Sequence, residues 1–84
     1  MQDPTVIVLP AQGAWQVQVE GTDDLQAFAE RYHALECAHR WAQAHRPSLV
    51  RVLASDGAVE DEWAYGMFKG IRRLGPTLPA QSAR

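Results

Sequence analysis

The sequence contains one cysteine, Cys37, and therefore no internal disulfide, so a reducing cytoplasm is the simplest compartment. No apolar run approaches the roughly 18–20 residues that span a bilayer. The apolar run at residues 5–10 is too short for the core of a signal peptide, and no basic region precedes it. We therefore expect a cytoplasmic protein that is neither disulfide-rich nor held in a membrane.

Motifs for phosphate binding and hydrolysis are missing as well. The six glycines never fall in the GxGxxG or GxxxxGKS/T spacing, and neither GxSxG nor HExxH occurs. A chain of 84 residues is also too small for a deep cleft. The sequence thus predicts a protein that is not an enzyme and carries no cofactor.

What is present is the composition of one small globular domain, 46% hydrophobic and 21% charged, with a net charge of −2. Residues 1–66 hold four basic and ten acidic side chains, a formal charge of −6. Residues 67–84 hold four basic side chains and no acid, a charge of +4. We therefore expect a single domain over residues 1–66 followed by a basic C-terminal extension over residues 67–84.

Two strands are expected at the start of the chain. Residues 14–20 alternate apolar and polar side chains, which is typical of a strand with one buried face. Residues 5–9 are apolar on both faces, and the turn residues 10–13 join the two segments into an antiparallel hairpin. Residues 25–29 fit either a short third strand or the first turn of a helix, and we favour the strand.

Residues 32–46 have helical periodicity, and Pro47 ends the pattern. Their buried stripe is expected to contain Ala34, Leu35, Ala38, Trp41, Ala42 and His45. The alanines make this face thin, which lets a helix lie close to a sheet.

A second hairpin follows the helix. Residues 49–54 and 58–65 are its strands, and Asp61 interrupts the apolar parity of the second, which predicts that its outer half is either bulged or exposed. Residues 66–74 have apolar side chains at helical spacing, so we expect a short amphipathic helix to residue 74 and a disordered end over residues 75–84.

The element order is β-β-(β)-α-β-β, with a short C-terminal helix, and it predicts a two-layer α+β domain. One main helix packs on one face of a mostly antiparallel sheet. Because one helix covers one face, the other face stays open and is expected to contact a second copy or another protein. The candidate interaction residues are Ile7, Leu9, Phe28, Met67, Phe68 and Ile71. The last three either join that contact or cover the open face themselves.

Nucleic-acid binding is the alternative function. Basic side chains of the helix and the C-terminal extension could neutralise phosphates, with Trp63, Tyr65 or Phe68 stacking on bases. The candidate contacts are Arg31, Arg40, Lys69, Arg72 and Arg73. The acidic run at residues 60–62 interrupts this basic character.

Two further clusters contain residue types that can carry chemistry. His33 and Cys37 lie four residues apart on the helix, but a metal site needs three or four ligands, and a mid-helix thiol lacks an orienting base. The acids at residues 60–62 match no calcium-loop spacing and suit a solvated edge strand. We expect no catalytic residue and no metal.

Several motifs together resemble a bacterial family known as domain of unknown function 2188. They are the GAW opening of the strand at residues 13–15, the ALECAHRWA pattern of the helix at residues 34–42, the strand LVRV at residues 49–52, the turn DGAV at residues 56–59 and the closing YG at residues 65–66. The resemblance covers about residues 6–66. It implies a small β-rich α+β domain, and the family assigns no catalytic residue.

Overall fold

A computed structural model describes residues 3–75 of the chain. One helix and six strands follow one another along the sequence. Their bounds are β1 Thr5–Ala11, β2 Ala14–Val19, β3 Leu25–Phe28, α1 Arg31–Ala44, β4 Ser48–Leu53, β5 Val59–Tyr65 and β6 Ile71–Arg73. The third strand, which the sequence left open against a helical turn, is confirmed as a strand.

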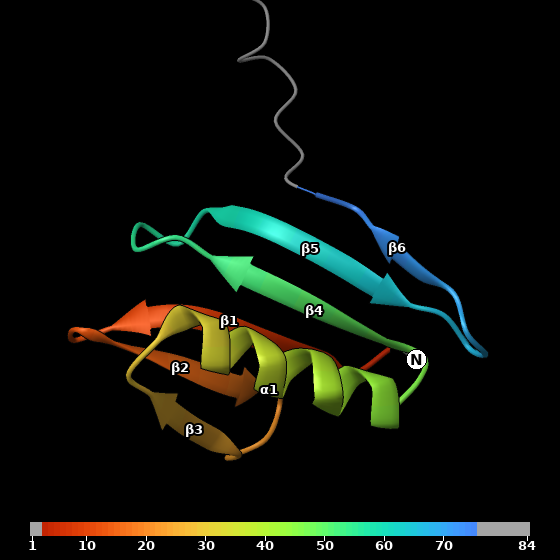
Figure 1. Cartoon of the computed structure of the whole chain (residues 1–84), viewed down its shortest axis with the longest axis horizontal. Helices are drawn as coiled ribbons and strands as arrows, with labels where there is room; N and C mark the ends of the chain where they lie inside the picture. Colours follow the sequence, from red (N-terminus) through yellow and green to blue (C-terminus); the bar gives the residue numbers. More distant parts are fainter. Residues whose placement is uncertain (1–2, 76–84) are drawn as a thin grey trace, which may run out of the picture.

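All six strands form one sheet in the order β3-β2-β1-β4-β5-β6. Every neighbouring pair is antiparallel except β1 and β4, which run parallel, with β2, β3 and α1 between them in the sequence. Figure 1 shows α1 lying across one face of the sheet, over the half that contains β3, β2 and β1, while β5 and β6 extend beyond it. The predicted α+β class with one helix on one sheet face is confirmed.

The core lies between α1 and the two central strands. Val6 and Val8 of β1 and Val50 and Val52 of β4 are fully buried. The helix meets these branched side chains with its small face, formed by Ala34, Ala38 and Ala42, all with no exposed surface. Because alanine adds only one carbon beyond the backbone, the helix approaches the sheet closely and valine side chains fill the space.

A tight turn closes the first hairpin. Gln12 and Gly13 both have positive φ, 55° and 77°, which is the geometry of a two-residue turn of the type that matches strand twist. Ala11 and Ala14 pair directly across it, so β1 runs through Pro10. The proline is tolerated because pairing of β1 with β4 ends at Val8, before the missing N–H would be needed.

The helix has weak caps. Glu30 at its N-terminus makes no side-chain capping bond, and no acidic residue lies in the first turn. At the other end the buried Ser48 hydroxyl donates to the Ala42 carbonyl at 2.8 Å. The helix ends at Ala44, so His45 is exposed and stacks on Trp41, and its predicted place in the buried stripe is wrong. Helix stability therefore comes mainly from packing of the alanine face.

The predicted irregularity in β5 is present. Val52 pairs with Asp61, but the next residue of β4, Leu53, pairs with Val59, so Glu60 is the extra residue of a bulge. The bulge moves Val59 to the opposite face from Asp61. Asp61 faces the helix side of the sheet because it pairs with the buried Val52.

The predicted C-terminal helix is wrong. Ile71–Arg73 form β6, which pairs with the end of β5 and extends the sheet by one edge strand. The Gly66 N–H donates to the Gly70 carbonyl at 2.8 Å, which closes the connection between the two strands. Two glycines weaken a helix at this point, and the exposed edge of β5 offers the backbone a partner. From residue 76 on, the predicted disordered end lies outside the described residues.

Close approach of α1 to the sheet leads to a stability prediction. Replacing Ala38 by leucine forces extra volume into the contact and should lower the free energy of unfolding by about 1–3 kcal/mol. The same substitution at Ala44, which is exposed, should change it by less than about 0.5 kcal/mol. Urea unfolding of both variants measures the difference, and equal effects would contradict the close contact.

Candidate functional site

The sheet face opposite α1 has no layer over it within residues 3–75 (Figure 1). Strand register places Ile7 and Leu9 there, since they alternate with the buried Val6 and Val8. Leu49 and Leu53 of the neighbouring strand β4 lie on the same face by the same alternation. These four half-buried aliphatic side chains, together with the residues around them on this side of the sheet, are called the open face below.

An ion pair lies in the middle of the open face. Arg51 Nε donates to Glu62 Oε2 at 2.9 Å, across the pair β4–β5. Arg51 is also the register partner of Ile7 on β1. The side chains are only 31% and 17% exposed, so both charges are largely withdrawn from water. In the sequence, the alternation of Leu49, Arg51 and Leu53 indicates that Arg51 lies on the same face as the two leucines. Its partner Glu62 can be identified only from the register of β4 and β5.

Phe28 is not on the open face, so its expected position there is wrong. It pairs with Trp15 of β2 and packs against the core on the helix side. The register of β3 sets this side, because Gln26 pairs with the buried Val17 and Leu25 pairs with Gln18. Alternation along the strand places Phe28 opposite Leu25, but nothing in the local sequence says which of the two faces the helix.

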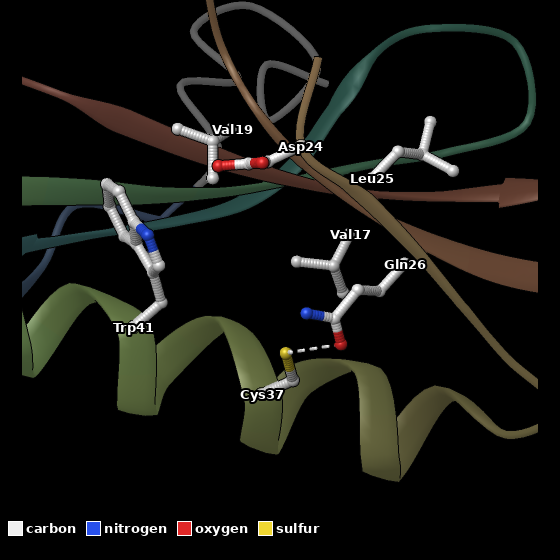
Figure 2. A pocket seen from close by; sticks show the side chains of 7 residues that line it. All are labelled: Val17, Val19, Asp24, Leu25, Gln26, Cys37 and Trp41. Atoms are coloured by element: carbon white, nitrogen blue, oxygen red, sulfur yellow. Dashed lines mark hydrogen bonds between the residues drawn. The ribbon is translucent and has the colours of Figure 1, made fainter. Parts of the chain in front are cut away.

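A cleft of about 200 Å³ separates β3 from α1 (Figure 2). Val17, Val19 and Trp41 give it apolar walls, and Asp24 and Leu25 lie at its strand side. Figure 2 shows Gln26 and Cys37 pointing toward each other across it, with the thiol sulfur 3.8 Å from the amide oxygen. The thiol is thus a weak donor to a side-chain amide at the helix–sheet boundary.

The remaining candidate interaction residues lie on the β5–β6 side of the molecule. Met67 and Phe68 are on the connection between these strands and are 63% and 85% exposed. Ile71 pairs with Tyr65, which places it on the helix side of an edge strand, and it is exposed as well. This segment extends the sheet sideways and does not cover the open face.

The acidic run of β5 is engaged by three different arginines. Glu60 accepts from Arg31 at 2.9 Å, and Glu62 accepts from Arg51 on the open face. Buried Asp61 accepts two bonds from Arg73, at 2.6 and 3.0 Å. The Arg73 hydrogen bond is the main reason that the pKa of Asp61 lies below its usual value. The three carboxylates therefore diverge and do not form one site.

The five basic residues of the nucleic-acid alternative do not form one patch. Arg31 and Arg73 face acids of β5, and Arg40 lies 3.6 Å from Glu36 on the helix. Arg72 pairs with Ala64, which places it on the open-face side, opposite from Arg73. Lys69 is exposed on the β5–β6 connection. Three of the five guanidinium or ammonium groups thus have carboxylate partners, which lowers the charge available to phosphates.

A second polar cluster joins α1 to β5. His39 Nδ1 and the Tyr65 hydroxyl are 2.7 Å apart and hydrogen-bonded, and the His39 ring meets Trp63 edge to face at 4.6 Å. Burial lowers the pKa of His39, with the Asp61 carboxylate opposing, and burial raises the pKa of Tyr65. Arg46 lies over the Tyr65 ring and donates to the Gly66 and Gly70 carbonyls at 3.0 Å. Sequence reasoning missed this cluster because each contact in it joins residues that are 19 or more positions apart.

Across residues 3–75, no three histidine, cysteine or acidic side chains gather in a group that could hold a metal ion. His33 and Cys37 have no third candidate ligand beside them in that range. In the same part of the chain, no helix has the length and apolar character needed to cross a bilayer.

Over residues 3–75, the fold and its surfaces define a small α+β domain with one sheet face covered by a helix and one face uncovered. The chain belongs to the family described as an uncharacterized protein conserved in bacteria (DUF2188), which matches residues 6–65. This confirms the resemblance drawn from the GAW, ALECAHRWA and YG motifs. No curated protein and no solved structure matches the chain.

The buried histidine leads to a pH prediction. Because the pKa of His39 is lower in the folded protein than its ordinary value of 6.5, the unfolded chain binds more protons below that value. The contribution of neutral His39 to the free energy of unfolding is complete above about pH 6.5 and is lost as the pH falls below that value. When the pH is lowered from neutral to mildly acidic, the urea midpoint of unfolding should therefore fall less in His39→Gln than in the natural chain. Parallel pH dependence in the two proteins would contradict this role.

Proposed function

We propose that this chain is a cytoplasmic, non-enzymatic interaction domain that self-associates through its open face. The observation that carries the proposal is the row of aliphatic side chains, Ile7, Leu9, Leu49 and Leu53, on a sheet face that no described element covers. Apolar surface gathered in this way on a small domain favours a protein contact. The free thiol of Cys37 is compatible with a reducing compartment.

The dimensions of the open face suit a small specific interface. Six strands about 4.8 Å apart and central strands of six or seven residues at about 3.3 Å per residue give a flat footprint of roughly 500 Å². Exposed Leu25, Val59 and Leu74 add apolar area at its rim. A specific interface needs about 600 Å² per partner at its lower limit, and a surface rough with side chains exceeds its flat footprint.

The central ion pair favours a second copy as the occupant. In a two-fold contact each patch meets its own copy, so a surface must be complementary to itself. Arg51 and Glu62 lie side by side, and a two-fold axis near them sets the arginine of one copy against the glutamate of the other. The pair is then surrounded by leucine and isoleucine from both copies, which keeps the charges matched after water is removed.

Self-association is preferred over nucleic-acid binding. The arginines that would contact phosphates are in large part paired with the acids of β5 and α1, and Arg72 and Arg73 point to opposite faces of the sheet. A duplex or single strand needs a continuous basic surface.

The proposal predicts an oligomer that a single charge on the open face disrupts. The natural chain should sediment with twice its mass of 9.3 kDa. Gln16 of β2 lies on the open face because it pairs with Leu9. Gln16→Lys and Leu53→Glu each place an unpaired charge in the contact and should give monomers, since removing water from an unpaired charge is strongly unfavourable. Sedimentation velocity measures this, and unfolding midpoints show whether each variant remains folded.

The control is Gln43→Lys, at an exposed position of α1, which should leave the oligomer intact. A natural chain that sediments as a monomer at its highest soluble concentration would rule the proposal out. Salt-sensitive binding to generic DNA or RNA, lost in Arg72→Glu, would support the alternative function in its place.

A further inference from the structure

A second surface lies at the free edge of β3 and does not depend on the open face. β3 has the sequence LQAF, without charge or proline, and three of its four residues are exposed. Natural edge strands are commonly protected by charged residues, prolines or bulges. The opposite edge strand, β6, has such protection in Arg72 and Arg73. The β3 edge is therefore open to an additional strand.

The backbone groups of β3 that face outward are known from its pairing with β2. The Val19 N–H donates to the Asp24 carbonyl at 3.2 Å, and bonding residues alternate along an antiparallel pair. Gln26 and Phe28 thus bond to β2, whereas Leu25 and Ala27 present their N–H and C=O groups outward. An added strand would find two residues ready to form main-chain hydrogen bonds.

A groove runs beside this edge on the helix side of the sheet. It has a volume of about 390 Å³, and it is lined by the side chains of β3 that face the helix and by one stripe of the helix. Its lining residues are Gln26, Phe28, Cys37, Arg40, Trp41 and Ala44. The Gln26–Cys37 contact in Figure 2 separates this groove from the cleft already described. Alternate side chains of an added strand would enter the groove.

The charges around the edge are mainly acidic. Asp23 and Asp24 precede β3, Glu30 follows it, and Glu36 on α1 lies 3.6 Å from Arg40, the arginine that lines the groove. Exposed carboxylates at both ends of a short strand attract positive charge and repel acids.

From these observations we infer that the β3 edge binds an extended basic peptide of a partner protein. Main-chain bonds to Leu25 and Ala27 supply part of the affinity, and one apolar peptide side chain fills the groove beside Phe28 and Trp41. Basic peptide residues on either side of this anchor face Asp23 and Glu30. A β6 strand of a second copy fits less well, because its Arg73 already donates two bonds to Asp61.

The test uses the full chain and a capped nine-residue peptide with alternating valine and threonine at its centre and two lysines at each end. Saturating peptide should slow amide hydrogen exchange of Leu25 and Ala27 about tenfold and leave Gln26, which already bonds to β2, nearly unchanged. The same peptide with glutamates in place of lysines should bind about tenfold more weakly at low salt.

Ala27→Pro removes an outward N–H that the sheet does not use, so the variant should fold and lose peptide binding. Its matched control, Ala27→Ser, keeps the N–H and should bind as the natural chain does. Leu53→Glu, on β4 and three strands from this edge, should also bind normally, which separates failure of this inference from failure of the open-face proposal. Unchanged exchange at Leu25 and Ala27, or equal binding by Ala27→Pro, would overturn the inference. So would an oligomer that Ala27→Pro alone converts to monomer, because the edge would then hold a second copy.

Discussion

The close contact between the alanine face of α1 and the valines of the two central strands is the constraint on which the structure depends. Ala34, Ala38 and Ala42 let the helix backbone approach the parallel pair β1–β4, where Val6, Val8, Val50 and Val52 are fully buried. The caps of this helix are weak, so this packing holds the helix in place. Because the side chains on this helix face are small, α1 covers a narrow part of the sheet, and β5 and β6 extend beyond it (Figure 1).

The limited cover explains how polar residues enter the helix side of the sheet. At the edge of the area that α1 covers, Asp61 of β5 is paired with Arg73. The side chains of His39 and Tyr65 are hydrogen-bonded to each other there, and the His39 ring meets Trp63 edge to face. Each of these groups has a hydrogen-bond or ring partner, as partly buried polar side chains require. The acidic run at residues 60–62, which looks like one cluster in the sequence, is divided among three arginines by the bulge and by strand alternation.

The two proposed contact surfaces exist for the same physical reason. Within residues 3–75, this two-layer domain leaves one sheet face and two sheet edges without a covering element. The open face offers a partner apolar area with a self-complementary ion pair at its centre. The β3 edge offers backbone N–H and C=O groups that β2 does not use, beside a groove and with carboxylates around it. One surface thus favours a like partner and the other a basic one.

Local pattern was sufficient for much of the fold. Alternation over residues 14–20, the turn residues 10–13 and helical spacing over residues 32–46 were sufficient to predict the hairpin, the helix and the α+β class. Each of these depends on periodicity or turn chemistry within a few neighbouring residues. The break at Asp61 even indicated the bulge in β5.

Only the tertiary structure decided which face Phe28 occupies, that residues 71–73 form a strand and not a helix, and which arginine meets which acid. These features depend on pairing between residues that are distant in sequence: Phe28 follows the register of β3 on β2, and β6 exists because β5 offers a free edge. A short segment has nearly equal local preferences for two conformations or two faces, so the partner strand determines the outcome.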